Sequence, residues 1–160
     1  MLFSDNRRAN GTDVPMQLTV ENIKTVLDEY TNFYDGLVVS MNYSYTVAGG
    51  LLAIRVYVRS QLSGRKRTVR ISAEGPREVR FVENNTCSAV MSAGLQIAQI
   101  GESFYVALSP YCDDMTDVED FRRSDFYFAA KDVEVSLEDS ASEWVPPEPW
   151  PLAFGPKNHA

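Results

Sequence analysis

Histidine and cysteine are scarce in this chain of 160 residues, which has one histidine, His159, and two cysteines, Cys87 and Cys112. Histidine is the usual general base and a common metal ligand near neutral pH. The scarcity of histidine argues against Ser-His-Asp and Cys-His catalysis, so we predict no catalytic residue and no enzyme activity. The two cysteines lack the spacing of metal ligands. A disulfide between them is possible, but we expect two free thiols, as in a reducing cytosol. We also expect no metal site and no cofactor.

Long apolar runs are also missing, because no stretch approaches the roughly 18 apolar residues that a membrane-spanning helix needs. The N-terminal segment has no hydrophobic run of the kind that a secretory signal carries. No GxGxxG or Walker motif for nucleotides is present. The net charge is −7 and the sequence pI is about 4.7, whereas nucleic-acid binders and lipid-surface segments are usually basic. These features predict a cytoplasmic, bacterial-type protein that binds neither nucleic acid nor membrane.

Charge is distributed unevenly along the chain. Residues 51–82 hold eight arginine and lysine residues against two glutamates, and the remainder holds seven basic and 20 acidic residues. Such asymmetry predicts a polarised surface, and polarised surfaces select their partners. An acidic protein attracts basic partners, and this attraction mainly raises the rate of association.

The first 16 residues are polar and irregular, and we predict a flexible arm there. The next segment repeats apolar residues at helical spacing, with Thr19 placed to cap the helix and Gly36 placed to end it. The apolar stripe of this predicted helix consists of Ile23, Val26, Leu27, Tyr30, Phe33 and Tyr34.

After Gly36 the apolar period changes from 3.6 to 2, which is typical of half-buried strands. The first strand should point Leu37, Val39 and Met41 to one face. The alternation slips between Ala130 and Val133, which predicts a bulge or a turn at 131–132. The pattern predicts an α+β domain over 17–138, in which an N-terminal amphipathic helix packs on a curved, mostly antiparallel sheet or partly open barrel of seven to eight strands. One face of that sheet should be wet.

The last segment, 139–160, is rich in proline, with four prolines among residues 146–151. Such a run favours an extended polyproline conformation. Trp144 and Trp150 lie in the same tail, and exposed tryptophan is rare unless it docks somewhere. We expect one of three arrangements for the tail. It either packs on the domain's own sheet, fills a groove of a partner, or joins copies of the chain into a homo-oligomer.

Acidic residues cluster between 109 and 123, in a segment that also contains two aromatic residues. The spacing does not match a calcium-binding loop, so we predict no metal there. The segment is either a solvated acidic loop or the contact surface for a basic partner, with the aromatic residues as anchors. The candidate partner-binding residues are Tyr111, Asp113, Asp114, Asp117, Glu119, Asp120 and Phe121.

The basic residues form a stripe on two neighbouring strands. Arg55 and Arg59 share one face, and Arg70 lies on the polar face of the next strand, so pairing of the strands would place them side by side. Their repulsion is offset either by the chain's own carboxylates, in the acidic loop or at Glu74 and Glu78, or by an anionic ligand or an acidic patch on a partner. Arginine recognises carboxylate and phosphate groups in a bidentate manner.

Four short segments resemble small uncharacterised bacterial proteins, several of which are immunity proteins of polymorphic toxin systems. The segments are Tyr34-Asp35-Gly36-Leu37-Val38, Val69-Arg70-Ile71, Glu78-Val79-Arg80-Phe81 and Ser124-Asp125-Phe126. This resemblance implies a protein that binds and blocks a cognate toxin. It implies no catalytic residue.

The favoured function is therefore a non-catalytic protein-interaction module, an acidic immunity-type protein that binds and neutralises a partner protein such as a basic toxin. The alternative is a small-molecule or anion-binding domain that uses the arginine stripe of residues 55–80. An enzyme that uses carboxylates alone and an assembly component that acts through its tail remain further alternatives.

Overall fold

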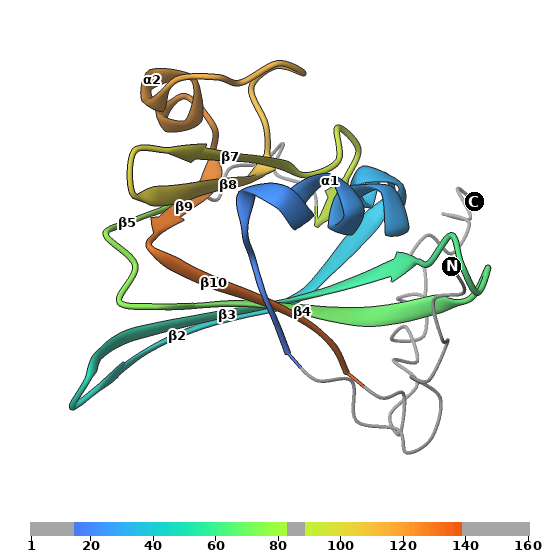
Figure 1. The fold of residues 1–160 in the computed structure, drawn as a ribbon, viewed down its shortest axis with the longest axis horizontal. Coiled ribbons are helices and arrows are strands. Elements are labelled where there is room, and N and C mark those ends of the chain that lie inside the picture. Colours follow the sequence, from blue (N-terminus) through green and yellow to red (C-terminus); the bar gives the residue numbers. More distant parts are fainter. Residues whose placement is uncertain (1–14, 83–88, 139–160) are drawn as a thin grey trace, which may run out of the picture.

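The computed structural model describes residues 15–82 and 89–138, which form two facing antiparallel sheets (Figure 1). None of the helices in these ranges is long and apolar enough to cross a membrane. The elements in chain order are β1 (Met16–Gln17), α1 (Val20–Glu29), η1 (Thr31–Phe33), β2 (Gly36–Thr46), β3 (Gly49–Arg59), β4 (Lys66–Glu74), β5 (Glu78–Phe81), β6 (Val90–Met91), β7 (Gln96–Ile100), β8 (Ser103–Ser109), α2 (Val118–Arg122), β9 (Phe126–Ala130) and β10 (Asp132–Glu138).

The predicted α+β class with mostly antiparallel strands is confirmed, but the single curved sheet or partly open barrel is wrong. Within the described ranges, sheet A has the strand order β1-β10-β4-β3-β2-β6 and sheet B has the order β5-β9-β8-β7. The chain leaves sheet A at Gly75, which has a φ of +55°, and it returns from β9 to β10 at Lys131. The predicted turn at 131–132 is thus the crossing between the sheets. β1 and β6 were not predicted, because two residues are too few to show a period.

The alternation of β2 starts one residue out of step with the prediction. A bulge lies between Val38 and Ser40 in the pairing with β3. Val38 and Met41 therefore pack against the core, whereas Leu37 pairs with Tyr57 on the other face. The prediction that Leu37 shares the face of Met41 is wrong, because a bulge adds one residue and changes the phase. Val39 is the bulged residue and has no register partner in β3.

Two hydrophobic clusters bury the two faces of sheet B. The first fills the space between the sheets and includes Ile54 and Val56 of β3 together with Phe128 of β9, all fully buried. The second lies on the outer face of sheet B, where Tyr127 of β9 packs with Phe121. All five residues of β9 are buried. The prediction of one wet face thus applies to sheet A and is wrong for sheet B.

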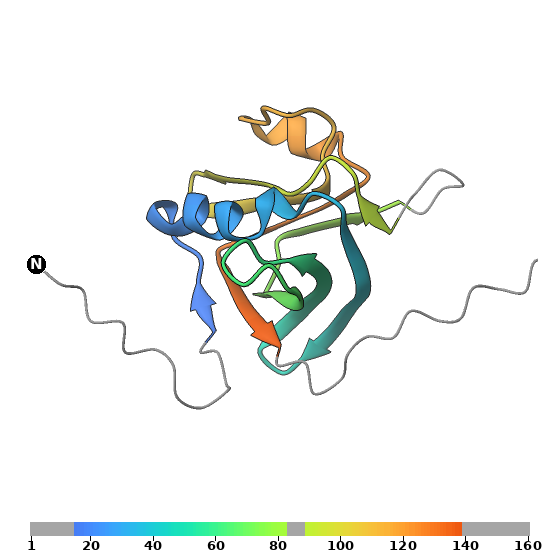
Figure 2. The ribbon, with the colours of Figure 1, turned by 90° about the vertical axis from the view of Figure 1, so that its right-hand side faces the viewer.

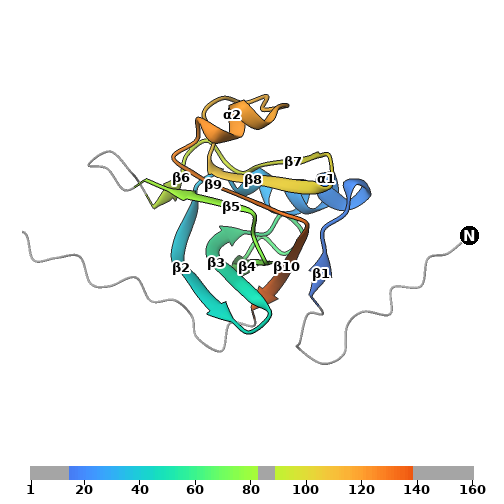
Figure 3. The same cartoon turned by 90° about the vertical axis from the view of Figure 1, so that its left-hand side faces the viewer.

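Helix α1 packs on the inter-sheet core at one side of the molecule, next to β1 (Figure 3). The predicted cap is confirmed, because Thr19 is the N-cap residue and its N–H donates to Asn22 Oδ1 at 2.8 Å. Two predicted boundaries are wrong: the helix ends at Glu29 rather than near Gly36, and Met16 of the predicted arm pairs with Val135 in sheet A. Residues 1–14 and the predicted tail 139–160 lie outside the described residues.

The helix ends early because a left-handed turn follows it. Thr31, Asn32 and Phe33 have φ values of 54°, 52° and 60°, a conformation that costs about 1–2 kcal/mol per residue. Complete burial of Phe33 offsets part of this cost, with its ring 5.2 Å from that of Tyr30. The Asn32 carbonyl also accepts the Leu95 N–H at 2.7 Å. The same turn leaves Tyr34, a predicted member of the apolar stripe, exposed.

Phe128 should carry a large share of the packing between the sheets. We expect Phe128→Ala to lower the free energy of unfolding by about 3–5 kcal/mol, because it removes a fully buried ring and leaves a cavity. Val79 is the cross-strand neighbour of Phe128 and is 40% exposed, so Val79→Ala should cost about 1 kcal/mol or less. Urea unfolding measures both values, and equal losses would contradict this account of the core.

Candidate functional site

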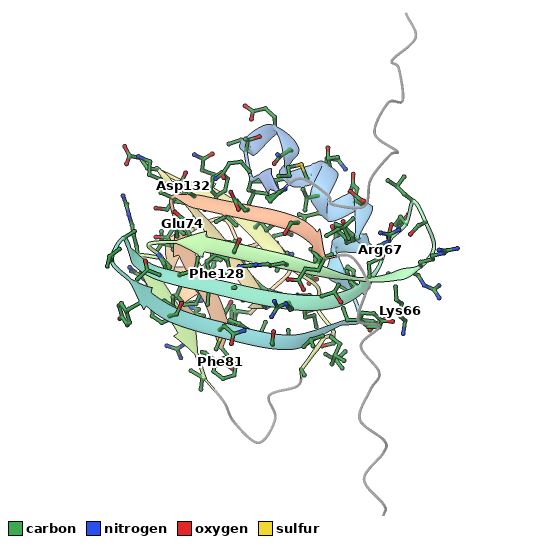
Figure 4. All side chains as sticks on the ribbon, turned by 90° about the horizontal axis from the view of Figure 1, so that it is seen from below. Lys66, Arg67, Glu74, Phe81, Phe128 and Asp132 are labelled. Carbon is green, nitrogen blue, oxygen red and sulfur yellow. The ribbon has the colours of Figure 1, made fainter. Side chains whose placement is uncertain are left out.

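The outer face of sheet A carries a row of polar side chains that crosses four strands. Arg55 of β3 lies opposite Ser40 of β2 on one side and opposite Arg70 of β4 on the other, and Arg70 lies opposite Ser136 of β10. Figure 4 shows this face of the sheet. The strand register therefore places Arg55 and Arg70 side by side on this face, as predicted.

Two further cations extend this row towards one end of the sheet. Arg59 shares the face of Arg55 and lies opposite Lys66, whose Nζ is 5.7 Å from the centre of the Tyr57 ring. We call Arg55, Arg59, Lys66 and Arg70 the basic face. Figure 4 shows Lys66 at one end of the sheet, with Glu74 and Asp132 at the other. The outer face of sheet A is thus itself polarised along its strands.

Glu138 neutralises one member of the basic face. The Nε of Arg55 donates to Glu138 Oε2 at 2.7 Å and lies 2.9 Å from Oε1. The two side chains are 39% and 29% exposed, and such pairs contribute little to stability. The carboxylate that offsets Arg55 therefore comes from the end of β10, and not from the acidic loop, Glu74 or Glu78 as the sequence predicted.

Arg70 lies next to this pair with an unsatisfied donor. Its Nε is buried and has no hydrogen-bond partner, and the same is true of Ser40 Oγ in the same row. A buried polar group without a partner costs about 1–3 kcal/mol.

The acidic loop lies on the opposite side of the molecule, outside sheet B (Figure 1). It contains helix α2 and is held by Phe121, which is fully buried with its ring 5.5 Å from that of Tyr105. Met115 is also buried, and Ser124 Oγ lies 3.5 Å from its Sδ. The prediction that Phe121 anchors a partner is wrong, because its ring attaches the loop to the domain's own sheet.

Three of the predicted carboxylates form hydrogen bonds or ion pairs within the loop. Asp117 is the N-cap residue of α2 and accepts the Asp120 N–H at 2.9 Å. Asp120 in turn accepts the Thr116 N–H at 3.4 Å, and Glu119 pairs with Arg122 at 2.8 Å. These contacts fix the course of the loop.

The remaining predicted residues form its outward surface. Asp113 and Asp114 are exposed. Tyr111 is 61% exposed, and the guanidinium carbon of Arg123 lies 5.6 Å from the centre of its ring. We call Tyr111, Asp113 and Asp114 the acidic surface. The loop thus presents carboxylates and one aromatic ring from a segment that is packed from below.

Glu78 joins the acidic loop to sheet B, a role that the sequence did not predict. Arg122 Nη2 donates to Glu78 Oε1 at 2.8 Å, and the Tyr127 hydroxyl donates to Oε2 at 2.9 Å. The Arg122 guanidinium holds the pKa of Glu78 below its ordinary value. Burial of Tyr127 raises the pKa of its hydroxyl, and the hydrogen bond to Glu78 raises this pKa further. Glu78 and Arg122 are 44 residues apart, so no local pattern could reveal the pair.

A shallow hollow of about 250 Å³ lies beside the left-handed turn and is lined by Asp28, Thr31, Asn32 and Gln61. Gln61 Nε2 donates to Thr31 Oγ1 at 3.0 Å across it. In the described part of the chain, no three histidine, cysteine, aspartate or glutamate side chains lie close enough together to hold a metal ion. Cys112 is a free, exposed cysteine, whereas Cys87 and His159 lie outside the described residues.

Comparisons of the chain with protein-family models, curated proteins and solved structures find no match. The resemblance to immunity proteins therefore stays a prediction. The segments that carry it lie at the start of β2, in β4, in β5 and before β9. Each is thus a strand or the entry to one.

The pairing of Glu78 with Arg122 should make stability depend on pH. Because the pKa of Glu78 is lower in the folded protein than its ordinary value of 4.5, its ionised form favours folding. This stabilisation is present above pH 4.5 and is lost as the pH falls through the lower folded value.

We therefore expect Glu78→Gln to lower stability at neutral pH and to unfold with a weaker pH dependence below pH 4.5 than the unsubstituted protein. Urea unfolding at a series of pH values measures this. Glu134→Gln, an exposed position on β10, is the matched control. If the stability of Glu78→Gln depends on pH in the same way as that of the unsubstituted protein, the pH dependence does not come from Glu78.

Proposed function

We propose that this chain is a non-catalytic protein-interaction module of the immunity type, which binds a basic partner protein through the acidic surface. The observation that carries the proposal is the attachment of this loop by a hydrophobic cluster of its own. Phe121 and Met115 are buried beneath it, while Asp113 and Asp114 are exposed.

Rigid support matters because ordering a mobile loop on binding costs affinity. The Asp117 cap, the Glu119–Arg122 pair and the Arg122–Glu78 pair support the 117–122 part of the acidic loop, next to the acidic surface. The exposed ring of Tyr111 offers an aromatic anchor, and the neighbouring carboxylates are complementary to a cationic surface.

The separation of charge favours one orientation of the encounter. The acidic loop lies outside sheet B, and the basic face lies on the outer side of sheet A (Figures 1 and 4). A basic partner is attracted to the first, whereas the cations of the second stand beside carboxylates of the same face, at Glu74, Asp132 and Glu134, and attract it less. Such complementarity raises the association rate and suppresses wrong orientations.

Reversal of charge on the acidic surface tests the proposal. We expect Asp113→Lys combined with Asp114→Lys to weaken binding of the partner by about tenfold or more, because attraction becomes repulsion. The probes are the purified products of the genes that flank this one, and calorimetry measures the dissociation constants.

Asp132→Lys combined with Glu134→Lys is the matched control. It makes the same change in net charge at two exposed positions on β10, on the other side of the molecule, and should leave binding nearly unchanged. Absence of a complex at micromolar concentrations with both proteins folded would end the proposal. Equal weakening by both variants would reduce it to an effect of overall charge.

The basic face favours a second candidate function, the binding of an anionic ligand or of an acidic group on a partner. The specific observation is that Arg70 lies directly opposite Arg55 in the strand register and forms no ion pair within residues 15–82 and 89–138. Carboxylate and phosphate oxygens are the acceptors that a guanidinium group binds best. Glu138 already contacts Arg55 from one side, which leaves Arg70 as the donor for a ligand.

Thermal-shift titration with inorganic phosphate and with a polyglutamate peptide tests this second candidate. A ligand at 100 times its dissociation constant adds about 2.7 kcal/mol of stability. We expect Arg70→Gln to lose this shift, and Arg65→Gln, at an exposed position in the β3–β4 turn, to keep it. No shift in the unsubstituted protein, or a full shift in Arg70→Gln, would contradict the assignment.

A further inference from the structure

Within residues 15–82 and 89–138, β2 is an open edge of sheet A over most of its length. It pairs with β3 from Leu37 to Thr46, but β6 covers its other side only at Gly36 and Leu37. One more hydrogen bond, from the Val38 N–H to the Ala89 carbonyl at 2.8 Å, extends this cover. From residue 39 to residue 46, no strand of the described ranges pairs with this edge. Open edges present unpaired backbone groups that another strand can bind.

This edge lacks the usual protection against pairing. Charged side chains and prolines commonly block the edges of sheets, yet residues 36–46 contain neither. The bulge between Val38 and Ser40 lies near the covered start of the strand. The stretch after the bulge is regular and can pair with another strand. In a chain with 37 charged residues, an uncharged strand of 11 residues at a sheet edge is an available pairing surface.

Apolar side chains beside the edge are exposed as well. Tyr43 and Tyr45 are 43% and 83% exposed, and their rings lie edge to face at 5.2 Å. Tyr43 pairs with the fully buried Leu52, so its side chain projects on the face that looks towards sheet B. Phe81 of β5 projects into the same space from sheet B and is 45% exposed.

β2 and β5 lie on the same side of the molecule, away from α1 (Figures 2 and 3). Helix α1 therefore covers one side of the inter-sheet core, whereas the opposite side keeps aromatic residues at the surface. This arrangement of an uncharged strand edge and exposed rings suits an occupant that supplies both a strand and apolar side chains.

The sequence of β2 is complementary to itself in the antiparallel direction. Residues that lie directly opposite each other in a sheet share a face, which allows a two-fold axis at Tyr43. In that register Tyr43 meets the second copy's Tyr43, and Met41 meets the second copy's Tyr45. Asn42 then meets the second copy's Ser44 on the outer face.

Each of these pairs is favourable or neutral. Aromatic pairs and sulfur–aromatic contacts stabilise neighbouring strands, and the amide of Asn42 can bond to the hydroxyl of Ser44. No like charges meet along the strand, although each copy carries a net charge of −7. We infer that two copies of this chain pair through their β2 edges, antiparallel and centred on Tyr43, and so form a dimer with a continuous sheet.

A charge swap at Asn42 and Ser44, both exposed, tests the dimer and its register together. Asn42→Lys combined with Ser44→Lys places lysine opposite lysine twice across the axis, and we expect this variant to be monomeric. Asn42→Glu combined with Ser44→Lys places glutamate opposite lysine twice, and we expect the dimer to return. Light scattering and sedimentation measure the mass of the full chain, and circular dichroism checks that each variant is folded.

The unsubstituted protein should dimerise with a dissociation constant in the micromolar range, about −8 kcal/mol. If the protein stays monomeric at concentrations up to about 100 times this dissociation constant, the inference is overturned, and the edge is then available to a strand of another protein. A dimer that survives the lysine pair would also overturn it. Loss of the dimer in both charge variants would overturn the proposed register.

Discussion

Tyr127 and Phe128 are neighbours in β9 that point to opposite faces of sheet B, and both are buried. Phe128 packs between the sheets, while Tyr127 packs beneath the acidic loop. The rest of the structure depends on this double burial, because it fixes the loop to the same strand that holds the core together. Glu78 strengthens the attachment, since it binds both the Tyr127 hydroxyl and Arg122 of the loop. The acidic surface is therefore positioned by the core itself.

Sheet A has a different balance, because its inner face is buried and its outer face is wet. Strand pairing forces Arg55 and Arg70 together on that outer face, and Glu138 offsets only one of them directly. The fold tolerates this because partly exposed charges are well screened by solvent. That outer face also carries Glu74, Asp132 and Glu134, so its positive charge is local to the basic face, and this local separation of charge is a basis for oriented encounters.

The sequence could predict those parts that depend on period and local pairing. Leu52, Ile54 and Val56 alternate, and all three are fully buried; the tight turn after Arg59 made the meeting of Arg55 with Arg70 predictable. Met115 and Phe121 show no period within their acidic segment, so the second cluster could not be foreseen. The partner of Arg55 is 83 residues away. Such contacts follow from the crossing of the chain between two sheets, which no local pattern records.

Pairing through β2 would not compete with either charged surface. A two-fold axis at Tyr43 runs perpendicular to the sheet, so the outer faces of both A sheets would lie on one side of the dimer. The two acidic loops, which lie beyond the B sheets, would lie on the other side. A partner with two basic sites could then bind both loops, and linkage of two contacts raises the effective affinity without any new contact. Three surfaces of the fold thus face in different directions: the uncharged β2 edge, the acidic loop and the basic face.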